Sequence, residues 1–259
     1  MPKFCANLSM MFTEHAFADR FAAASKAGFK GVEYLFPYVL PKADIAERLV
    51  ANKLTQVLFN LPAGNWDKGE RGIACHPGRV NEFKGGVGTA IEYAKALGCS
   101  MVNCLAGIKP QDASREKAWE TLVANVAYAA AALHKEGILL LVEPINNYDI
   151  PGFLLNRSAD GIAVMDAVNS PNLKLQYDFY HMQRMEGELA ATSQKLLPRI
   201  GHIQIADNPG RNEPGTGEIN FPILFKHLDS IGYQGWVGCE YKPKAGTVEG
   251  LGWLSAIRA

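Results

Sequence analysis

The stretch Ile138-Leu139-Leu140-Leu141-Val142-Glu143-Pro144 decides the fold. It holds five consecutive apolar residues and then a carboxylate, and a run of this length suits a strand better than a helix. Because no polar residue interrupts the run, both faces of the strand are expected to be buried. Burial on both faces is typical of a parallel strand that lies between other layers of an α/β protein. The stretch therefore predicts a buried parallel strand with Glu143 at its carboxyl end.

Similar short apolar or β-branched runs occur along the rest of the chain, and segments with helical periodicity separate them. This alternation is typical of parallel βα units. The expected strands are Lys3–Asn7, Gly31–Leu35, Thr55–Leu61, Met101–Leu105, Ile138–Glu143, Leu173–Asp178, Gly201–Ala206 and Trp236–Glu240. The expected helices are Glu14–Ala27, Lys42–Asn52, Val80–Leu97, Ser114–Gly137, Ser158–Val168, Glu188–Leu197 and Phe221–Ser230.

Eight strands in 259 residues correspond to about 32 residues per unit, which predicts a (β/α)8 TIM barrel. A doubly wound parallel sheet is the alternative. No linker or low-complexity segment marks a boundary, so we expect a single domain over residues 1–259. Two long connections, Pro62–Arg79 and Asp207–Asn220, follow the third and seventh strands. In a barrel they would lie at the C-terminal face, where such folds carry their active sites.

Charge and hydropathy argue against several classes of partner. Lys and Arg number 26, as do Asp and Glu, and no basic stripe occurs, so no nucleic-acid partner is expected. The longest apolar stretches, Ala127–Leu133 and Ile138–Val142, are far shorter than the roughly 18 residues of a membrane-spanning helix. The first residues lack the apolar core of a signal peptide, so we expect a cytoplasmic protein. The five cysteines include no C-x-x-C pair, which argues against a zinc ribbon.

Polar side chains follow the later strands of the predicted barrel. Glu143, Asp178 and Glu240 close the fifth, sixth and eighth strands, and Gln204 lies in the seventh. Each of them alone could be a helix cap or an ion-pair partner. Together they would meet at one rim, where converging carboxylates repel one another unless a cation neutralises them. Oxygen ligands favour a hard ion, so the pattern predicts a divalent cation site for Mg²⁺ or Mn²⁺.

Motifs along nearly the whole chain resemble the hydroxypyruvate isomerase family. They are Asn7–Met10, Asn60–Gly64, Gly69–Cys75, Val142–Asn146, Gln176–Asp178, His181–Gly187, Gln204–Pro209, Glu213–Ile219 and Gly238–Tyr241. The resemblance implies a xylose-isomerase-like TIM barrel, in a family that also holds 2-oxo-tetronate isomerases. It implies that Glu143, Asp178, Gln204 and Glu240 bind the metal, with Glu143 and Glu240 as the catalytic proton-transfer pair. Related sugar epimerases have histidine at the position of Gln204, which argues against a ketose 3-epimerase.

The resemblance implies an isomerase that interconverts an aldehyde and a ketone, in the class of intramolecular oxidoreductases. Its substrate would be a small hydroxy-oxo acid, with hydroxypyruvate converted to tartronate semialdehyde and a 2-oxo-tetronate as the alternative. Removal of a proton next to a carbonyl leaves an enediolate, whose negative charge a divalent cation can stabilise. Two carboxylates on opposite sides of the substrate would suit the transfer of the proton.

Several further residues are candidates for binding the substrate. Arg71, in the loop after the third strand, is the first candidate for the substrate carboxylate because arginine binds carboxylates bidentately. Arg184, Arg211 and Lys242 are the alternatives, and a solvated surface position is the simpler explanation for any one of them. His181, three residues beyond Asp178, would orient or polarise a substrate oxygen, unless it is a structural hydrogen-bonding residue. Asn60 would donate a hydrogen bond, and Trp66, Phe36 and Tyr38 would shape or merely pack beside the pocket.

Two other functions compete with the isomerase on the same scaffold. A metal-dependent phosphodiesterase of the endonuclease IV type would carry a histidine-rich multi-zinc site and a basic groove, which six scattered histidines and zero net charge oppose. A noncatalytic sugar-acid binding protein would not need two apposed glutamates. A homo-oligomer is expected only by analogy with the fold.

Overall fold

The strands close into one barrel in the computed structural model, which describes residues 2–257. All of the strands are parallel; each pairs with the next along the chain, and the last pairs with the first. They are β1 Lys3–Asn7, β2 Gly31–Glu33, β3 Thr55–Asn60, β4 Met101–Cys104, β5 Leu139–Val142, β6 Leu173–Asp178, β7 Ile200–Ile205 and β8 Trp236–Cys239. The predicted (β/α)8 barrel is confirmed, and the doubly wound sheet is excluded.

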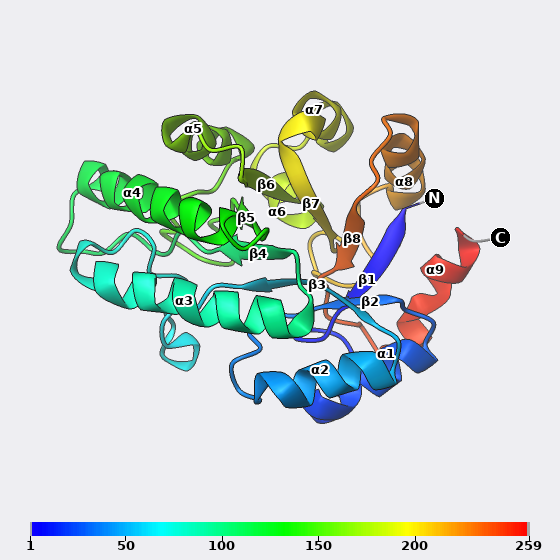
Figure 1. Cartoon of the computed structure of the whole chain (residues 1–259). Helices are drawn as coiled ribbons and strands as arrows, with labels where there is room; N and C mark the ends of the chain where they lie inside the picture. Colours follow the sequence, from blue (N-terminus) through cyan, green and yellow to red (C-terminus); the bar gives the residue numbers. More distant parts are fainter. Residues whose placement is uncertain (1, 258–259) are drawn as a thin grey trace.

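Helices surround the strands (Figure 1). They are α1 Arg20–Lys26, α2 Lys42–Ala51, α3 Val80–Leu97, α4 Arg115–His134, α5 Ser158–Val168, α6 Phe179–Met185, α7 Leu189–Leu196, α8 Phe221–Ser230 and α9 Gly252–Ala256. The short helices α6 and α9 were not predicted. Helix α6 starts where β6 ends, because Asp178 Oδ1 accepts a hydrogen bond from the amide of Tyr180, 2.8 Å away, and so caps the helix. Helix α9 packs on β1, with the rings of Phe4 and Trp253 5.2 Å apart.

The first helix is shorter than the predicted Glu14–Ala27. Only α1 is α-helical there, and a 3-10 turn at Phe17–Asp19 precedes it. The carboxylate of Glu14 accepts hydrogen bonds from the amide and hydroxyl of Thr247, and the Thr247 hydroxyl also accepts one from the amide of Phe12. Contacts with the far end of the chain therefore hold this segment out of a helix, and local periodicity does not reveal them.

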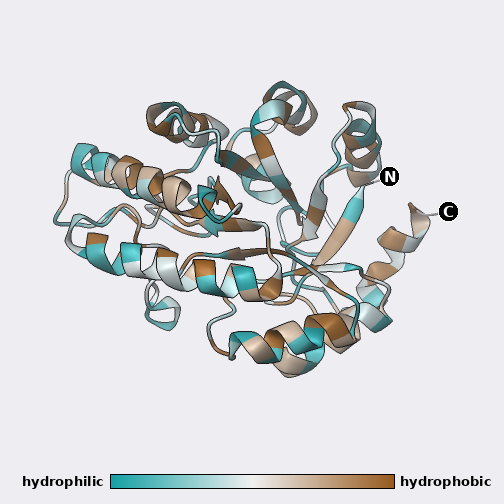
Figure 2. Ribbon diagram, in the orientation of Figure 1, coloured by the Kyte–Doolittle hydropathy of each residue, from teal (hydrophilic) through white to brown (hydrophobic). Residues whose placement is uncertain are grey.

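The barrel interior changes from apolar to polar along the strands. Alternate residues of a strand face opposite sides, so Leu139, Leu141 and Glu143 point into the barrel while Leu140 and Val142 pack against helices. Leu139 belongs to a small apolar cluster with Met101 and Trp236, near the start of the strands. Figure 2 shows hydrophobic and hydrophilic stretches alternating along α2, α3 and α4, as expected of helices with one buried face. The polar groups gather where the strands end.

No helix within residues 2–257 is both long enough and apolar enough to cross a membrane.

Candidate active site

The carboxyl ends of β5, β6 and β8 bring three acidic side chains together. Glu143, Asp178 and Glu240 are buried, and the ligand atoms of these three and of His181 all lie within 4.8 Å of one another. Glu143 and Glu240 line a cavity of about 60 Å³, together with Asn60, His181 and Arg211. Parallel strands explain this convergence, since their carboxyl ends share one rim of the barrel.

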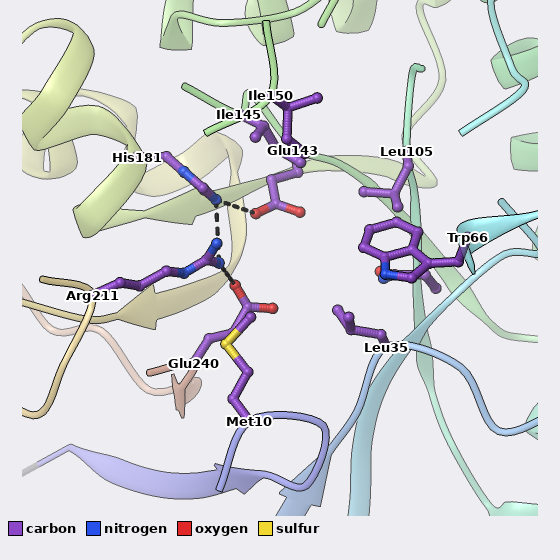
Figure 3. A pocket seen from close by; sticks show the side chains of 11 residues that line it. Met10, Leu35, Trp66, Leu105, Glu143, Ile145, Ile150, His181, Arg211 and Glu240 are labelled. Carbon is purple, nitrogen blue, oxygen red and sulfur yellow. Dashed lines mark hydrogen bonds and ion pairs between the residues drawn. The ribbon is translucent and has the colours of Figure 1, made fainter. Parts of the chain in front are cut away.

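The cavity has a polar side and an apolar side. Figure 3 shows Glu143, His181, Arg211 and Glu240 together, and the indole of Trp66 facing them across the cavity between Leu35 and Leu105. Phe36 supports Trp66 with a ring distance of 5.1 Å, so it packs behind the lining, and Tyr38 instead hydrogen bonds to the carbonyl oxygen of Asn60. A small polar molecule would therefore meet charged groups on one side and a wall of fixed shape on the other.

Burial and mutual repulsion raise the pKa values of the acids. Burial raises the pKa of Asp178 to about 6 and that of Glu240 to about 8, against the partial compensation of the Arg211 guanidinium. The pKa of Glu143 is well above its usual range because of burial and then the charges of Glu240 and Asp178. The cluster thus carries more acid than the single charge of Arg211 neutralises.

The acid cluster fits a divalent cation. The two carboxylate oxygens of Asp178 have different environments. Oδ1 caps α6, whereas Oδ2 is buried and has no hydrogen-bond partner among the described residues. An unpartnered buried carboxylate oxygen beside two further carboxylates is an arrangement that a hard cation stabilises. Glu143, Asp178 and Glu240 are therefore the groups that could hold a metal. Gln204 lies beside them, but its Oε1 already accepts a hydrogen bond from Gln176 at 2.6 Å, so it would reach the metal with its second lone pair.

His181 offers a proton donor to the cavity. The side-chain oxygen of Asn146 accepts hydrogen bonds from the amides of Tyr148 and Asp149, at 3.0 and 2.8 Å. The Asn146 Nδ2 group is thereby turned toward His181 Nδ1, 2.6 Å away, which must accept. Burial and the charge of Arg211 lower the pKa of His181 well below its usual range, so the ring is neutral and its proton lies on Nε2. This nitrogen, 3.6 Å from Asp178 Oδ2, suits a hydrogen bond to a substrate oxygen better than a metal bond.

Arg211 reaches the cavity from the loop after β7, which Asp207 holds in shape. The Asp207 carboxylate accepts hydrogen bonds from four backbone amides, those of Asn208, Gly215, Gly217 and Ile219. At Gly217 an added Cβ would lie 2.0 Å from the carbonyl oxygen of Asn208, so a side chain has no room there. The guanidinium of Arg211 donates to Glu240 Oε2 at 2.5 Å and lies 3.5 Å from His181 Nε2.

The other candidate substrate-binding residues lie farther from the acids or have other partners. The guanidinium of Arg71 stacks on Trp66, 4.2 Å from the ring centroid, and donates to the carbonyl oxygens of Trp66 and Glu70. Arg71 lines a neighbouring surface cleft, outside the cavity. The exposed Lys242 does not line the cavity either. Arg184 pairs with Asp149 at 2.9 Å. Asn60 does line the cavity, and its Oδ1 accepts a hydrogen bond from Asn103.

Sequence reasoning missed two amides that hold the glutamates. Asn103 Nδ2 donates to Glu143 Oε2 at 2.9 Å, and Asn7 Nδ2 donates to Glu240 Oε1 at 3.3 Å. Asn7 ends the first predicted strand, and Asn103 lies near the end of the fourth. The rule that selected the acids, a polar residue at the carboxyl end of a strand, would have found both amides if it had been applied to every strand.

Metal binding should release protons and strengthen as the pH rises. Since the pKa values of Asp178 and Glu240 are raised to about 6 and about 8 in the metal-free protein, a cation must displace protons from these groups below about pH 8. We expect the Mn²⁺ affinity to increase steadily between pH 6 and pH 8. Titration calorimetry in buffers of different ionisation enthalpy measures the released protons directly. An affinity independent of pH over this interval would contradict the expectation.

Comparison with known proteins places the chain in a class and then in a family. A family model described as xylose isomerase-like TIM barrel matches residues 21–257. Hydroxypyruvate isomerase of Escherichia coli (strain K12) is 54% identical over 258 residues, with 100% of both chains covered. The 2-oxo-tetronate isomerase of Cupriavidus necator is 51% identical over 254 residues, with 98% of each chain covered. A crystal structure described as AP endonuclease, family 2, from Brucella melitensis has a TM-score of 0.96 at 45% identity and covers 99% of both chains.

The barrel and its rim of acids thus define a xylose isomerase-like TIM barrel. Within this class, the chain belongs to the family of hydroxypyruvate and 2-oxo-tetronate isomerases.

Proposed function

We propose that the protein is an isomerase of small hydroxy-oxo acids that interconverts hydroxypyruvate and tartronate semialdehyde. One observation carries the proposal: Glu143 and Glu240, from strands on different sides of the barrel rim, line the same cavity and have raised pKa values. Two relatives at 54% and 51% identity are named as isomerases of hydroxypyruvate and of 2-oxo-tetronate, which supports this reaction type.

The two glutamates would divide the proton transfer between them. One carboxylate removes the proton from the carbon next to the carbonyl, the other group returns a proton to the neighbouring carbon, and the hydroxyl proton passes to the former carbonyl oxygen, so that no atom is gained or lost. Each is held for this task, Glu143 by Asn103 and Glu240 by Asn7 and Arg211. Glu143, Asp178 and Glu240, with the oxygen of Gln204, would hold Mg²⁺ or Mn²⁺. When bound, such a cation supplies Lewis-acid stabilisation to the oxygens that become negative during enediolate formation.

Arg211 is the best-placed group for the substrate carboxylate. It is the residue with a full positive charge among the described residues that line the cavity, and its side chain is 19% exposed. The neutral His181 would donate from Nε2 to a substrate oxygen. Arg71, the first candidate from the sequence, could act indirectly, because its stacking holds Trp66 against the cavity.

Substitution of the two arginines separates these roles. Arg211→Met should raise KM for the substrate by about 10- to 100-fold, since a charge-assisted hydrogen bond to a carboxylate contributes about 1.5–3 kcal/mol. It should also lower kcat, because Arg211 contacts Glu240. Arg71→Met should change KM by less than about fivefold, because its partners are backbone carbonyls and a ring. Steady-state kinetics on both variants measure the effects, and a larger KM increase for Arg71→Met would reverse the assignment.

The three-carbon acid is the first candidate because the relative named as hydroxypyruvate isomerase is 54% identical over 100% of both chains. The 2-oxo-tetronate remains the second candidate, because the two named relatives differ by only three percentage points in identity.

Direct comparison of the two acids tests the substrate. We expect kcat/KM for hydroxypyruvate to exceed that for 2-oxo-tetronate, with tartronate semialdehyde identified as the product by NMR. A higher kcat/KM for the four-carbon acid would assign the protein to the second substrate. Failure to convert either acid would contradict the isomerase proposal.

The same purified protein can be tested for the two competing functions, the metal-dependent phosphodiesterase and the sugar-acid binding protein. The groups within residues 2–257 that could hold a metal each contain a single histidine, unlike the histidine-rich centre expected of a multi-zinc phosphodiesterase. We therefore expect no cleavage of abasic-site DNA. A protein that binds hydroxypyruvate without converting it would instead be a sugar-acid binding protein.

A further inference from the structure

A fourth buried carboxylate lies among the polar groups of the barrel. Glu33, at the end of β2, is 1% exposed and receives side chains from two other strands, β1 and β7. Its Oε1 accepts hydrogen bonds from Asn7 Nδ2 at 3.1 Å and from Gln204 Nε2 at 2.7 Å. Its Oε2 lies 2.7 Å from His202 Nε2 and 3.4 Å from Cys5 Sγ. Glu33 is thus the common acceptor of a network that includes a candidate metal ligand.

These distances indicate hydrogen bonds and not a second metal site. Zinc ligands lie about 2.0–2.3 Å from the ion, so two ligand atoms on a tetrahedral ion are more than about 3 Å apart. The separation of 2.7 Å between His202 Nε2 and Glu33 Oε2 is that of a direct hydrogen bond.

The neighbouring strand is shaped to admit the Glu33 carboxylate. A Cβ at Gly238 would lie 2.4 Å from both oxygens of Glu33, so the carboxylate would have to move to admit any side chain there. Gly238 lies in β8 and Glu240 directly follows this strand, two residues later, so both positions face the barrel interior. The space for Glu33 therefore lies directly beside the strand that carries a proposed catalytic glutamate.

Glu33 and its neighbours fix the direction of two amides. Asn7 uses its oxygen to accept from the amide of Ser9 at 3.1 Å, so its Nδ2 must face the carboxylates of Glu33 and Glu240. Gln204 gives its Nε2 to Glu33, and this leaves its Oε1 on the opposite side, where Gln176 donates to it. Gln176 lies two residues before Asp178 on β6, so the oxygen of Gln204 is turned toward the strand that carries Asp178. The Glu33 carboxylate can only accept hydrogen bonds, so Gln204 cannot turn its oxygen toward Glu33.

We propose that Glu33 is a positioning residue of the active site, which orients Gln204 as an oxygen ligand and, together with the Ser9 amide, holds Asn7 as a donor to Glu240. Its effect on turnover rests on the proposed isomerase function, but its effect on metal affinity does not. Substitutions near a metal that misplace its ligands typically weaken binding by about 10- to 100-fold.

Three substitutions distinguish position from charge. Glu33→Leu removes the acceptor, Glu33→Gln keeps an oxygen at the same distance from the backbone, and Glu33→Asp keeps the charge but withdraws it by one methylene. Glu33→Gln should be tolerated best, because its amide oxygen can still accept from Gln204 and Asn7. His202 Nδ1 has no partner among the described residues, so the imidazole is free to exchange tautomers and accept from the new amide. Gln56→Leu is the matched control, a buried amide on β3 that donates to Leu58 of its own strand.

The readouts are Mn²⁺ affinity of the metal-free variants by calorimetry, kcat and KM, and thermal unfolding. We expect Mn²⁺ affinity and kcat to fall about tenfold or more for Glu33→Leu, less for Glu33→Asp, and by less than about fivefold for Glu33→Gln. Gln56→Leu should change neither. If Glu33→Leu does not fold, the ranking of Glu33→Gln above Glu33→Asp decides the proposal.

Three results would overturn the proposal. They are a folded Glu33→Leu with the Mn²⁺ affinity of the control, a Glu33→Asp that outperforms Glu33→Gln, and a wild-type protein that binds no Mn²⁺. Normal Mn²⁺ binding without turnover in the wild type would contradict the isomerase function alone, and the affinities would still decide the role of Glu33.

Discussion

Glu240→Gln is expected to lower kcat for isomerisation by about 10³-fold, within the range that removal of a general acid or base produces. The amide of glutamine retains the shape of the side chain but neither accepts nor delivers the proton. The substitution removes one of three mutually repelling acids, which stabilises the fold, and an ion pair with Arg211, which destabilises it. Because the two effects oppose each other, the fold should persist. We therefore expect the unfolding temperature to change by no more than a few degrees. Stopped assays with NMR detection of the product measure the residual rate.

Glu249→Gln provides the matched control for this substitution. Glu249 is exposed and lies in the segment after β8, so the same chemical change there should leave kcat and KM unchanged. A Glu240→Gln protein that turns over at a rate near that of the Glu249→Gln control would refute the proton-transfer role and, with it, the proposed mechanism.

Exhaustive chelation should reduce activity by about 10³-fold or more, because Lewis-acid stabilisation contributes several kcal/mol to the transition state. Mg²⁺ or Mn²⁺ should restore the activity. Asp178→Asn should mimic the chelated protein at low metal concentration. Its Oδ1 can still cap α6 by accepting from the amide of Tyr180, whereas the negative charge at the unpartnered oxygen is lost. Activity at increasing Mn²⁺ concentration measures the difference.

Elemental analysis after chelation is the necessary control, since a tightly held ion would survive mild treatment. Full activity in a protein shown to be free of metal would contradict the Lewis-acid role. Activity of Asp178→Asn at low Mn²⁺ equal to that of the wild type would remove Asp178 from the metal ligands.

Local patterns were sufficient for the strands and most of the helices. The apolar run before Glu143 and the similar runs elsewhere report on burial within a few residues, and the eight strands they predict all occur. The prediction was wrong for the first helix, where Thr247 competes for Glu14 from more than two hundred positions away. It also missed α6, because a polar strand end and a helix cap coincide at Asp178.

The sequence by itself determined that Glu143, Asp178, Gln204 and Glu240 follow strands whose ends meet at one rim, because strand direction and spacing are local properties. Only the tertiary structure decided which arginine side chain reaches these residues. Arg71 and Arg211 lie in similar polar loops, yet the first stacks on Trp66 and the second contacts Glu240. The tertiary structure also placed the Glu33 carboxylate beside Gly238 and directed the amide nitrogen of Gln204 toward Glu33. Such partners come from strands distant in the chain, and hydrogen-bond direction depends on three-dimensional contacts that no local pattern contains.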